Sequence, residues 1–159
     1  MRRVPRVLAG CGAAVVAVGG AAVGAWAVGG PEADLAYHGS AALSAGRVDV
    51  RFTPHHSGPS ALPDSAATVR LRWSEPLAER QVLPEGCARE GERAVLCRVG
   101  VLNADGVGER IELGVRLRGA PSEVLLEFDT VRSGTAVDGE RSEERQRVLV
   151  LDTGDTYYF

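Results

Sequence analysis

Alternation of apolar and polar residues is the feature that most restricts what this 159-residue chain can fold into. In residues 111–118 an isoleucine, two leucines and a valine alternate with a glycine and three charged residues. The same two-residue period recurs in five further segments, residues 47–52, 69–73, 95–99, 123–129 and 148–150. Successive side chains of a β-strand point to opposite faces, so each segment predicts a strand with one buried and one solvent-facing side.

Turn-forming sequences separate the alternating segments, such as Ser57-Gly58-Pro59-Ser60 and Asn103-Ala104-Asp105-Gly106. No stretch after residue 30 keeps a 3.6-residue period over three turns, so no helix is expected there. About seven short strands joined by turns predict an all-β, antiparallel sandwich. Trp73 and Phe52 are the largest expected members of its core.

The first thirty residues have the composition of an export signal. Three arginines lie within residues 1–6, and residues 7–30 contain no charged side chain. Ala25-Trp26-Ala27 supplies the small-x-small pattern of a signal-peptidase site, so residues 1–27 are predicted to be cleaved off. The alternative is an uncleaved membrane anchor over residues 7–30, since about 20 apolar residues can span a bilayer.

Export would place the mature domain in an oxidising compartment, either secreted or held outside the membrane by the anchor. Cys11 lies in the signal, which leaves Cys87 and Cys97 as a pair predicted to form a disulfide. The alternative, a catalytic thiol, lacks a histidine near either cysteine in the sequence. Without residues 1–27 the chain has 15 arginines and 21 acidic residues, a net charge of −6 that does not favour nucleic acid.

Several kinds of active site are not supported by the sequence. All 18 basic residues are arginine, so Schiff-base chemistry, a lysine base and a P-loop are excluded. No Gly-x-Ser-x-Gly elbow occurs. Adjacent residues of an extended chain point to opposite sides, so His55 and His56 are not expected to share a metal. We therefore expect no cofactor, no metal and no enzymatic activity.

Two groups of residues are candidates for binding. The first is a set of arginines that could lie on one solvent-facing sheet and hold an anionic wall polymer: Arg70, Arg72, Arg116 and Arg118. The alternative is that they pair with Glu112, Glu123 and Glu127, as on an ordinary charged face. The second is Tyr157-Tyr158-Phe159, in a predicted tail over residues 153–159. These aromatic residues are expected either to cover an open edge of the sandwich or to dock an envelope protein.

The order of features resembles a known family. Ala33-Asp34-Leu35 is followed by a strand and by His56-Ser57-Gly58-Pro59-Ser60, and later by Leu83-Pro84-Glu85-Gly86-Cys87 and Val95-Leu96-Cys97-Arg98-Val99-Gly100. This series, over about residues 33–152, resembles the "conserved repeat" immunoglobulin-like domains of bacterial cell-surface proteins. His56 stands where that family favours asparagine.

The resemblance implies an immunoglobulin-like sandwich with a structural or adhesion-like binding role at the cell surface. It carries no catalytic residues over to this chain. The expected function is therefore a secreted or envelope domain that binds without catalysis. The alternative is the ectodomain of a membrane-anchored accessory or sensor protein.

Overall fold

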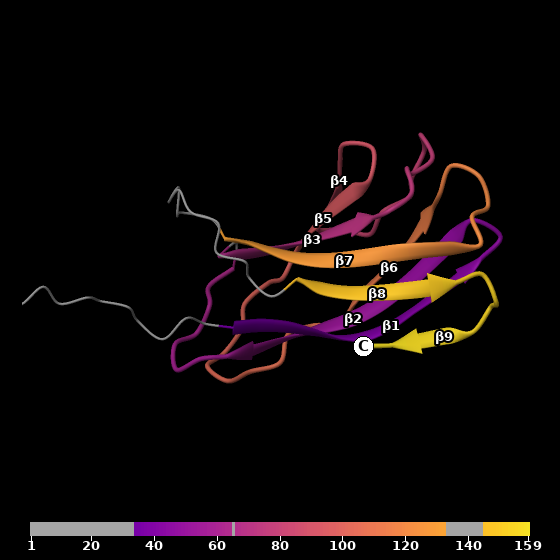
Figure 1. Ribbon diagram of the computed structural model, residues 1–159. Helices are drawn as coiled ribbons and strands as arrows, with labels where there is room; N and C mark the ends of the chain where they lie inside the picture. The colour runs from indigo at the N-terminus through magenta and orange to yellow at the C-terminus, as the bar shows by residue number, and fades with distance from the viewer. Residues whose placement is uncertain (1–33, 65, 133–144) are drawn as a thin grey trace, which may run out of the picture.

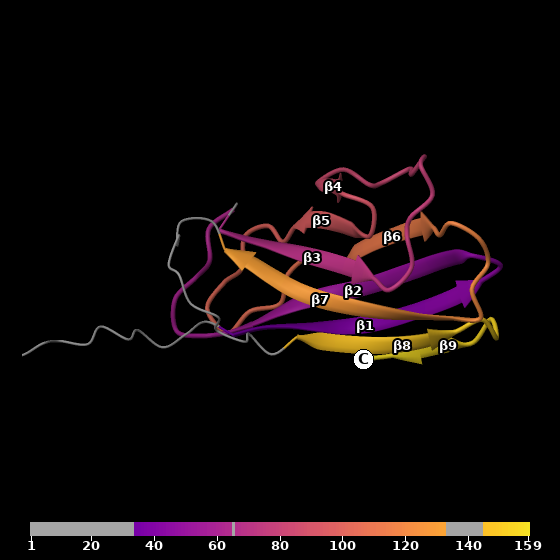
Figure 2. The same cartoon turned by 45° about the horizontal axis from the view of Figure 1, so that its top comes forward.

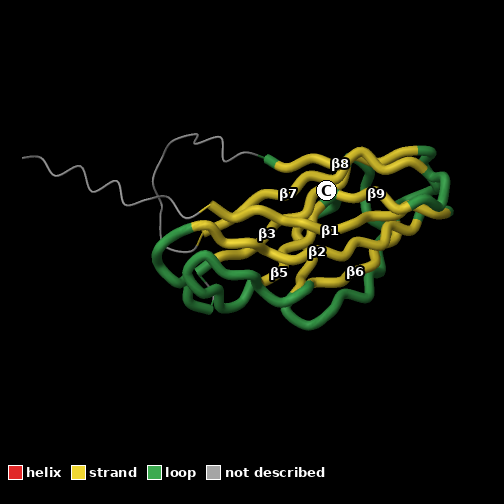
Figure 3. Tube along the Cα trace, turned by 90° about the horizontal axis from the view of Figure 1, so that it is seen from below, coloured by secondary structure: helices red, strands yellow, loops and turns green. Residues whose placement is uncertain are grey.

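The computed structural model describes residues 34–64, 66–132 and 145–159, and in these ranges the chain is all β (Figure 3). Nine strands are present in this part: β1 (Asp34–Ser44), β2 (Arg47–Ser57), β3 (Ala67–Trp73), β4 (Cys87–Glu90), β5 (Ala94–Arg98), β6 (Ile111–Arg116), β7 (Glu123–Arg132), β8 (Gln146–Leu151) and β9 (Thr156–Tyr158). No helix able to cross a bilayer occurs within the described ranges. The expected signal or anchor, with Ala25 and Ala27, lies outside them.

The strands form two antiparallel sheets that pack face to face (Figures 1 and 2). One sheet has the order β6-β2-β1-β9 and the other has the order β4-β5-β3-β7-β8. The chain crosses from the four-stranded to the five-stranded sheet between β2 and β3. It crosses back before β6, which pairs with β2, and crosses again before β7, which pairs with β3. These cross-connections are those of an immunoglobulin-like sandwich, so the predicted fold class is confirmed, with two strands more than the seven expected.

The core lies between the two sheets and is made by the apolar residues of each alternating segment. Strand β2 alternates strictly, with Val48, Val50 and Phe52 buried and its odd-numbered residues turned outward. Trp73 and Phe52 are both 1% exposed, as the alternation predicts. Four aromatic rings pack together in the core, with adjacent ring centres 4.9–5.7 Å apart: Tyr37, Phe52, Phe128 and Phe159.

Strand β1 was not among the segments predicted from alternation, although it is as long as β2. Its core face consists of Leu35, Tyr37, Gly39, Ala41 and Leu43, so two of its five core positions carry almost no side chain. Gly39 lies against Phe52, and a Cβ atom at Gly39 would be 2.0 Å from the Arg51 carbonyl oxygen. Small residues are needed for this close approach of two backbones, and the same small residues remove the hydrophobic signal of a strand.

The free edge of β1 is closed in two different ways. Strand β9 pairs with Ser40–Ala42, and Gly39 and Phe159 exchange both backbone hydrogen bonds. Beyond the end of β9, the Gln146 side chain pairs with the edge of β1. Its Nε2 donates to the Tyr37 carbonyl at 2.7 Å, and its Oε1 accepts from the Tyr37 N–H at 3.2 Å. The side-chain amide thus stands in for a strand residue and leaves the Tyr37 peptide satisfied.

Candidate functional site

The outer face of the five-stranded sheet carries charged side chains in rows that cross the strands. In one row the Arg147 Nε lies 2.9 Å from a Glu127 carboxylate oxygen, and Glu127 faces Arg72 on β3. In the next row the Arg145 Nε lies 3.3 Å from an Asp129 oxygen. Solvent-exposed pairs of this kind each contribute about 1 kcal/mol or less, so they organise the face more than they stabilise the fold.

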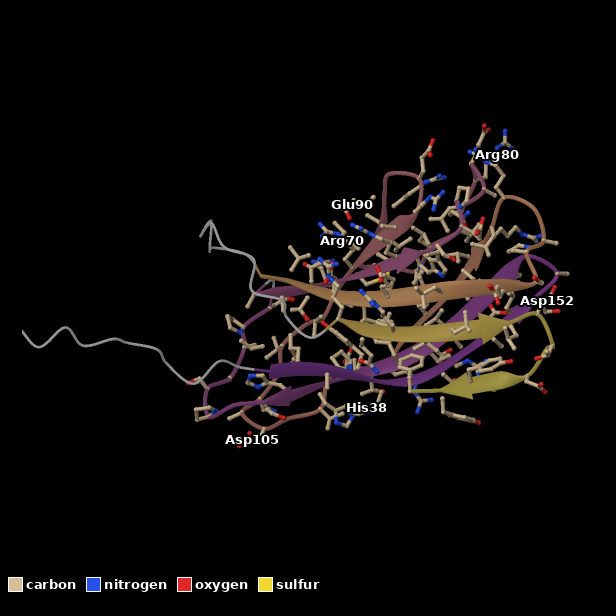
Figure 4. All side chains as sticks on the ribbon, viewed as in Figure 1. His38, Arg70, Arg80, Glu90, Asp105 and Asp152 are labelled. Carbon is tan, nitrogen blue, oxygen red and sulfur yellow. A yellow bond between two sulfur atoms is a disulfide. The ribbon has the colours of Figure 1, made fainter. Side chains whose placement is uncertain are left out.

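Arg70 is the best-satisfied arginine of this face. Its Nε and Nη2 donate to the two Glu90 carboxylate oxygens at 2.6 and 3.0 Å, and its Nη1 lies 4.0 Å from Asp129 (Figure 4). The hydrogen bond to Glu90 and its charge raise the pKa of Arg70, and the hydrogen bond from Arg70 lowers the pKa of Glu90. Arg70 therefore holds the β4–β5 hairpin to the sheet, and its guanidinium is already paired with carboxylates of the protein.

An open groove of about 480 Å³ lies beside this pair, between β3 and the β4–β5 hairpin. Arg70, Arg72 and Arg93 supply its positive charge, and Glu90 and Glu92 its negative charge. The Arg93 guanidinium donates to the Ser74 carbonyl. Arg72 is exposed and has no ion pair within the described residues, although its charge contributes to the lowered pKa of Glu90. Arg72 is thus the guanidinium of this groove that is available to an anion.

The four predicted binding arginines do not share one face. Arg70 and Arg72 lie on β3 in the five-stranded sheet, whereas Arg116 ends β6 in the four-stranded sheet and Arg118 lies beyond that strand. The expectation of a single arginine patch is therefore wrong. Alternation shows which residues of a strand share a side, but not which sheet the strand joins.

The expected alternative, pairing of these four arginines with Glu112, Glu123 and Glu127, is not found among the described residues, where Glu112 and Glu127 have other partners. Glu127 pairs with Arg147, and Glu112 is within 4.0 Å of both Arg51 and Arg110. Glu90 and Asp129, which the sequence did not single out, bind Arg70. Glu90 was missed because β4 is too short to show an alternation of its own, and the role of Asp129 was missed because the sequence does not reveal that β7 pairs with β3.

Cys87 and Cys97 form a disulfide between directly opposed residues of β4 and β5. Cys97 is buried in the core and Cys87 is half-buried, so the bridge attaches a four-residue edge strand to the sandwich. Arg89 reinforces this attachment by donating to the carbonyls of Leu77, Ala78 and Glu79. A disulfide suggests that the domain lies outside the cytoplasm.

The three histidines lie on strands, His38 on β1 and both His55 and His56 on β2, directly before the turn at Gly58-Pro59. His55 and His56 point to opposite sides of β2, as predicted, with His56 2% exposed and its Nδ1 3.1 Å from the Asn103 carbonyl oxygen. His38 on β1 instead meets His55, with ring centres 4.6 Å apart. The described residues contain no group of three or more potential metal ligands.

The C-terminal aromatic residues belong to the four-stranded sheet. Tyr157 lies opposite Ala41, and Phe159 stacks at an angle on Phe128, with ring centres 4.9 Å apart. Tyr158 alone points outward and is 83% exposed. Residues 156–159 therefore continue the sandwich past residue 152, and two of the three aromatic side chains cover its edge.

Comparisons with known proteins give no family for this chain. No family model matches it, and no curated protein does. Among solved structures it is similar to the GH20 exo-β-N-acetylglucosaminidase from Vibrio harveyi in complex with N-acetylglucosamine, with a TM-score of 0.34 and 16% identity. An inactive mutant of that enzyme gives 0.35 and 18%. Each match spans 77% of this chain and 18% of the enzyme, and likenesses this low carry no argument about function.

Proposed function

We propose that this chain is an exported immunoglobulin-like domain of the cell envelope that binds an anionic polymer through the outer face of its five-stranded sheet. It acts by binding, without catalysing a reaction. The observation that carries the proposal is the groove beside β3, where Arg72 is exposed and forms no ion pair with any other residue that the structure describes.

The charges of the groove favour an anion. The Glu90 carboxylate accepts two hydrogen bonds from Arg70, so the charges of these two side chains offset each other. The other charged residues of the lining are Arg72, Arg93 and Glu92, which leaves one positive charge in excess. A guanidinium binds a carboxylate or phosphate through two parallel hydrogen bonds, which gives both affinity and orientation. One such contact is weak in water, so a polymer that repeats the anionic group is a better ligand than a single small anion.

The surroundings of Arg72 also support binding along the sheet. Arg147 on β8 and Arg145, which directly precedes that strand, lie on the same outer face, and both are exposed. An extended polyanion that contacts Arg72 can therefore also bind Arg145 and Arg147, by replacing the carboxylates with which these arginines pair. We expect the affinity to fall as salt is added, because exposed charges are screened over about 10 Å at 0.1 M ionic strength.

Binding can be tested with poly(glycerol phosphate) and polyglutamate as phosphate and carboxylate probes. We expect Arg72→Glu to weaken binding by about tenfold or more, since it replaces the available cation with a repelling charge. Arg116→Glu is the matched control, because it makes the same charge change on the other sheet. Equal binding by the wild type and Arg72→Glu, or an equal loss in Arg116→Glu, would contradict the proposed site.

Export and attachment are tested separately from binding. Cleavage after Ala27 would give a secreted domain that starts at Val28, whereas retention of residues 7–30 would give an anchored accessory or sensor ectodomain. Intact mass of the native protein distinguishes these two states. Crosslinking in intact cells, followed by identification of the attached molecule, shows whether the partner is a wall polymer or an envelope protein.

A further inference from the structure

The outer face of the four-stranded sheet holds the pair of histidines that the sequence did not bring together. His38 lies opposite Thr53 and His55 lies opposite Ala36, so the two histidines are diagonal neighbours on adjacent antiparallel strands. Both side chains lie on the outer side of their strands. This face is on the opposite side of the sandwich from Arg70 and Glu90 (Figure 4).

The separation of the two rings suits coordination of one metal ion. Their centres are 4.6 Å apart and their planes are inclined by 80°. Two imidazoles that bind one ion at about 2.0 Å, with roughly 90° between the bonds, have ring centres about 4.5 Å apart. Rotation about the last torsion of a histidine is soft, so either ring can turn a nitrogen toward the ion without moving the backbone.

The backbone beneath the pair is fixed, which favours chelation. β1 and β2 pair over their whole length, from Asp34 opposite Ser57 to Ser44 opposite Arg47. A rigid scaffold holds the second imidazole near an ion that the first has bound, so little entropy is lost when the second bond forms. Solvent can fill the remaining coordination positions, because His38 is exposed.

The neighbouring charges on this face do not prevent cation binding. Arg51 on β2 and Arg110, which directly precedes β6, share the carboxylate of Glu112 at 4.0 and 3.9 Å. Val107, paired with His55 and 62% exposed, adds an apolar neighbour that carries no charge.

We infer that His38 and His55 form a surface site for a divalent transition metal of the kind that imidazole prefers, namely Cu²⁺, Ni²⁺ or Zn²⁺. The site has two protein ligands and water in its other positions. By the usual order of affinities Cu²⁺ binds most tightly. The site is separate from the arginine groove, so metal binding and polyanion binding can be disproved independently of each other.

The test is calorimetric titration of the untagged protein with Cu²⁺, Ni²⁺ and Zn²⁺ salts, together with the electron paramagnetic resonance of the Cu²⁺ complex. We expect one ion per chain and a spectrum with two coordinated nitrogens. His38→Asn and His55→Asn should each weaken binding by about tenfold or more, because a single imidazole lacks the chelate gain. Thr53→Ala, on the same face beside His38, is the control and should bind as the wild type does.

A Cu²⁺ affinity that is the same in both histidine variants as in the wild type would overturn the inference, as would a wild-type spectrum with one coordinated nitrogen. Absence of binding at millimolar Cu²⁺ would overturn it too. Unfolding curves of the variants show that any loss of binding comes from the ligand and not from the fold. None of these substitutions should change binding to the polyanion probes, which depends on the opposite face.

Discussion

Loss of the Cys87–Cys97 disulfide should destabilise the domain by a predictable amount. The bridge joins residues ten apart in sequence. In the chain-entropy model a closed loop of about 11 residues stabilises the folded state by about 3 kcal/mol, because it restricts the unfolded chain. For a domain of this size the loss corresponds to a fall in Tm of roughly 10 °C.

The variant for this measurement is Cys87→Ala, since Cys87 is half-buried and Cys97 remains to fill its place in the core. Urea unfolding of this variant gives the loss in free energy. Adding a reductant to the wild type should give the same loss with no change of sequence, and the reductant should have no effect on Cys87→Ala. The double variant with Cys97→Ala should lose about 1 kcal/mol more, because it also removes a buried sulfur.

The reasoning is refuted if Cys87→Ala and the reduced wild type both unfold within about 0.5 kcal/mol of the oxidised protein. That result would mean that β4 detaches from the sheet in the reduced native protein and regains its chain entropy there, or that the hairpin persists in the unfolded chain. Amide hydrogen exchange distinguishes these cases, because in the first case the backbone of β4 loses its protection in the reduced native protein, whereas in the second case it stays protected.

Three further predictions concern the fold. Gly39→Ala should lower the free energy of unfolding by about 1–3 kcal/mol in urea titrations, because the added Cβ would be 2.0 Å from the Arg51 carbonyl oxygen; an unchanged midpoint would contradict this close approach. Since the pKa of Glu90 is lowered from 4.5 by Arg70, the stability that this pair provides is present above pH 4.5 and lost as the pH falls below it. Glu90→Gln should therefore show a shallower loss of stability in acid, and an identical pH profile would count against the pair. Deletion of residues 157–159 should lower Tm, because it removes most of β9 and the ring stacked on the core; an unchanged Tm with loss of a bound partner would instead support a docking tail.

The extent to which sequence predicted structure varies from element to element. The alternation in β2, β3, β6 and β7 identified strands and their buried faces correctly, because burial of one side acts directly on residue choice. β1 was missed because Gly39 and Ala41 sit on its core face. β4 and β9 were missed because four and three residues are too few to show a period.

The candidate sites show the same division. Arg70 and Arg72 were correctly placed on one strand face, and the disulfide followed from the number of cysteines. The grouping of Arg116 and Arg118 with them failed, since the sequence does not reveal that β6 lies in the other sheet. The contact between His38 and His55 depends on the register of β1 and β2, which no local pattern specifies.

The sequence by itself determined that this chain is a β protein, which residues of each long strand face the core, and that two cysteines remain for a disulfide. These properties depend on neighbours within a few residues, where side-chain direction follows the two-residue period of the strand. Only the tertiary structure decided which strands are partners, and with them the groove at Arg72, the amide of Gln146 on the edge of β1, and the histidine pair. Each depends on contacts between residues far apart in sequence, whose pairing is set by the packing of the whole sandwich.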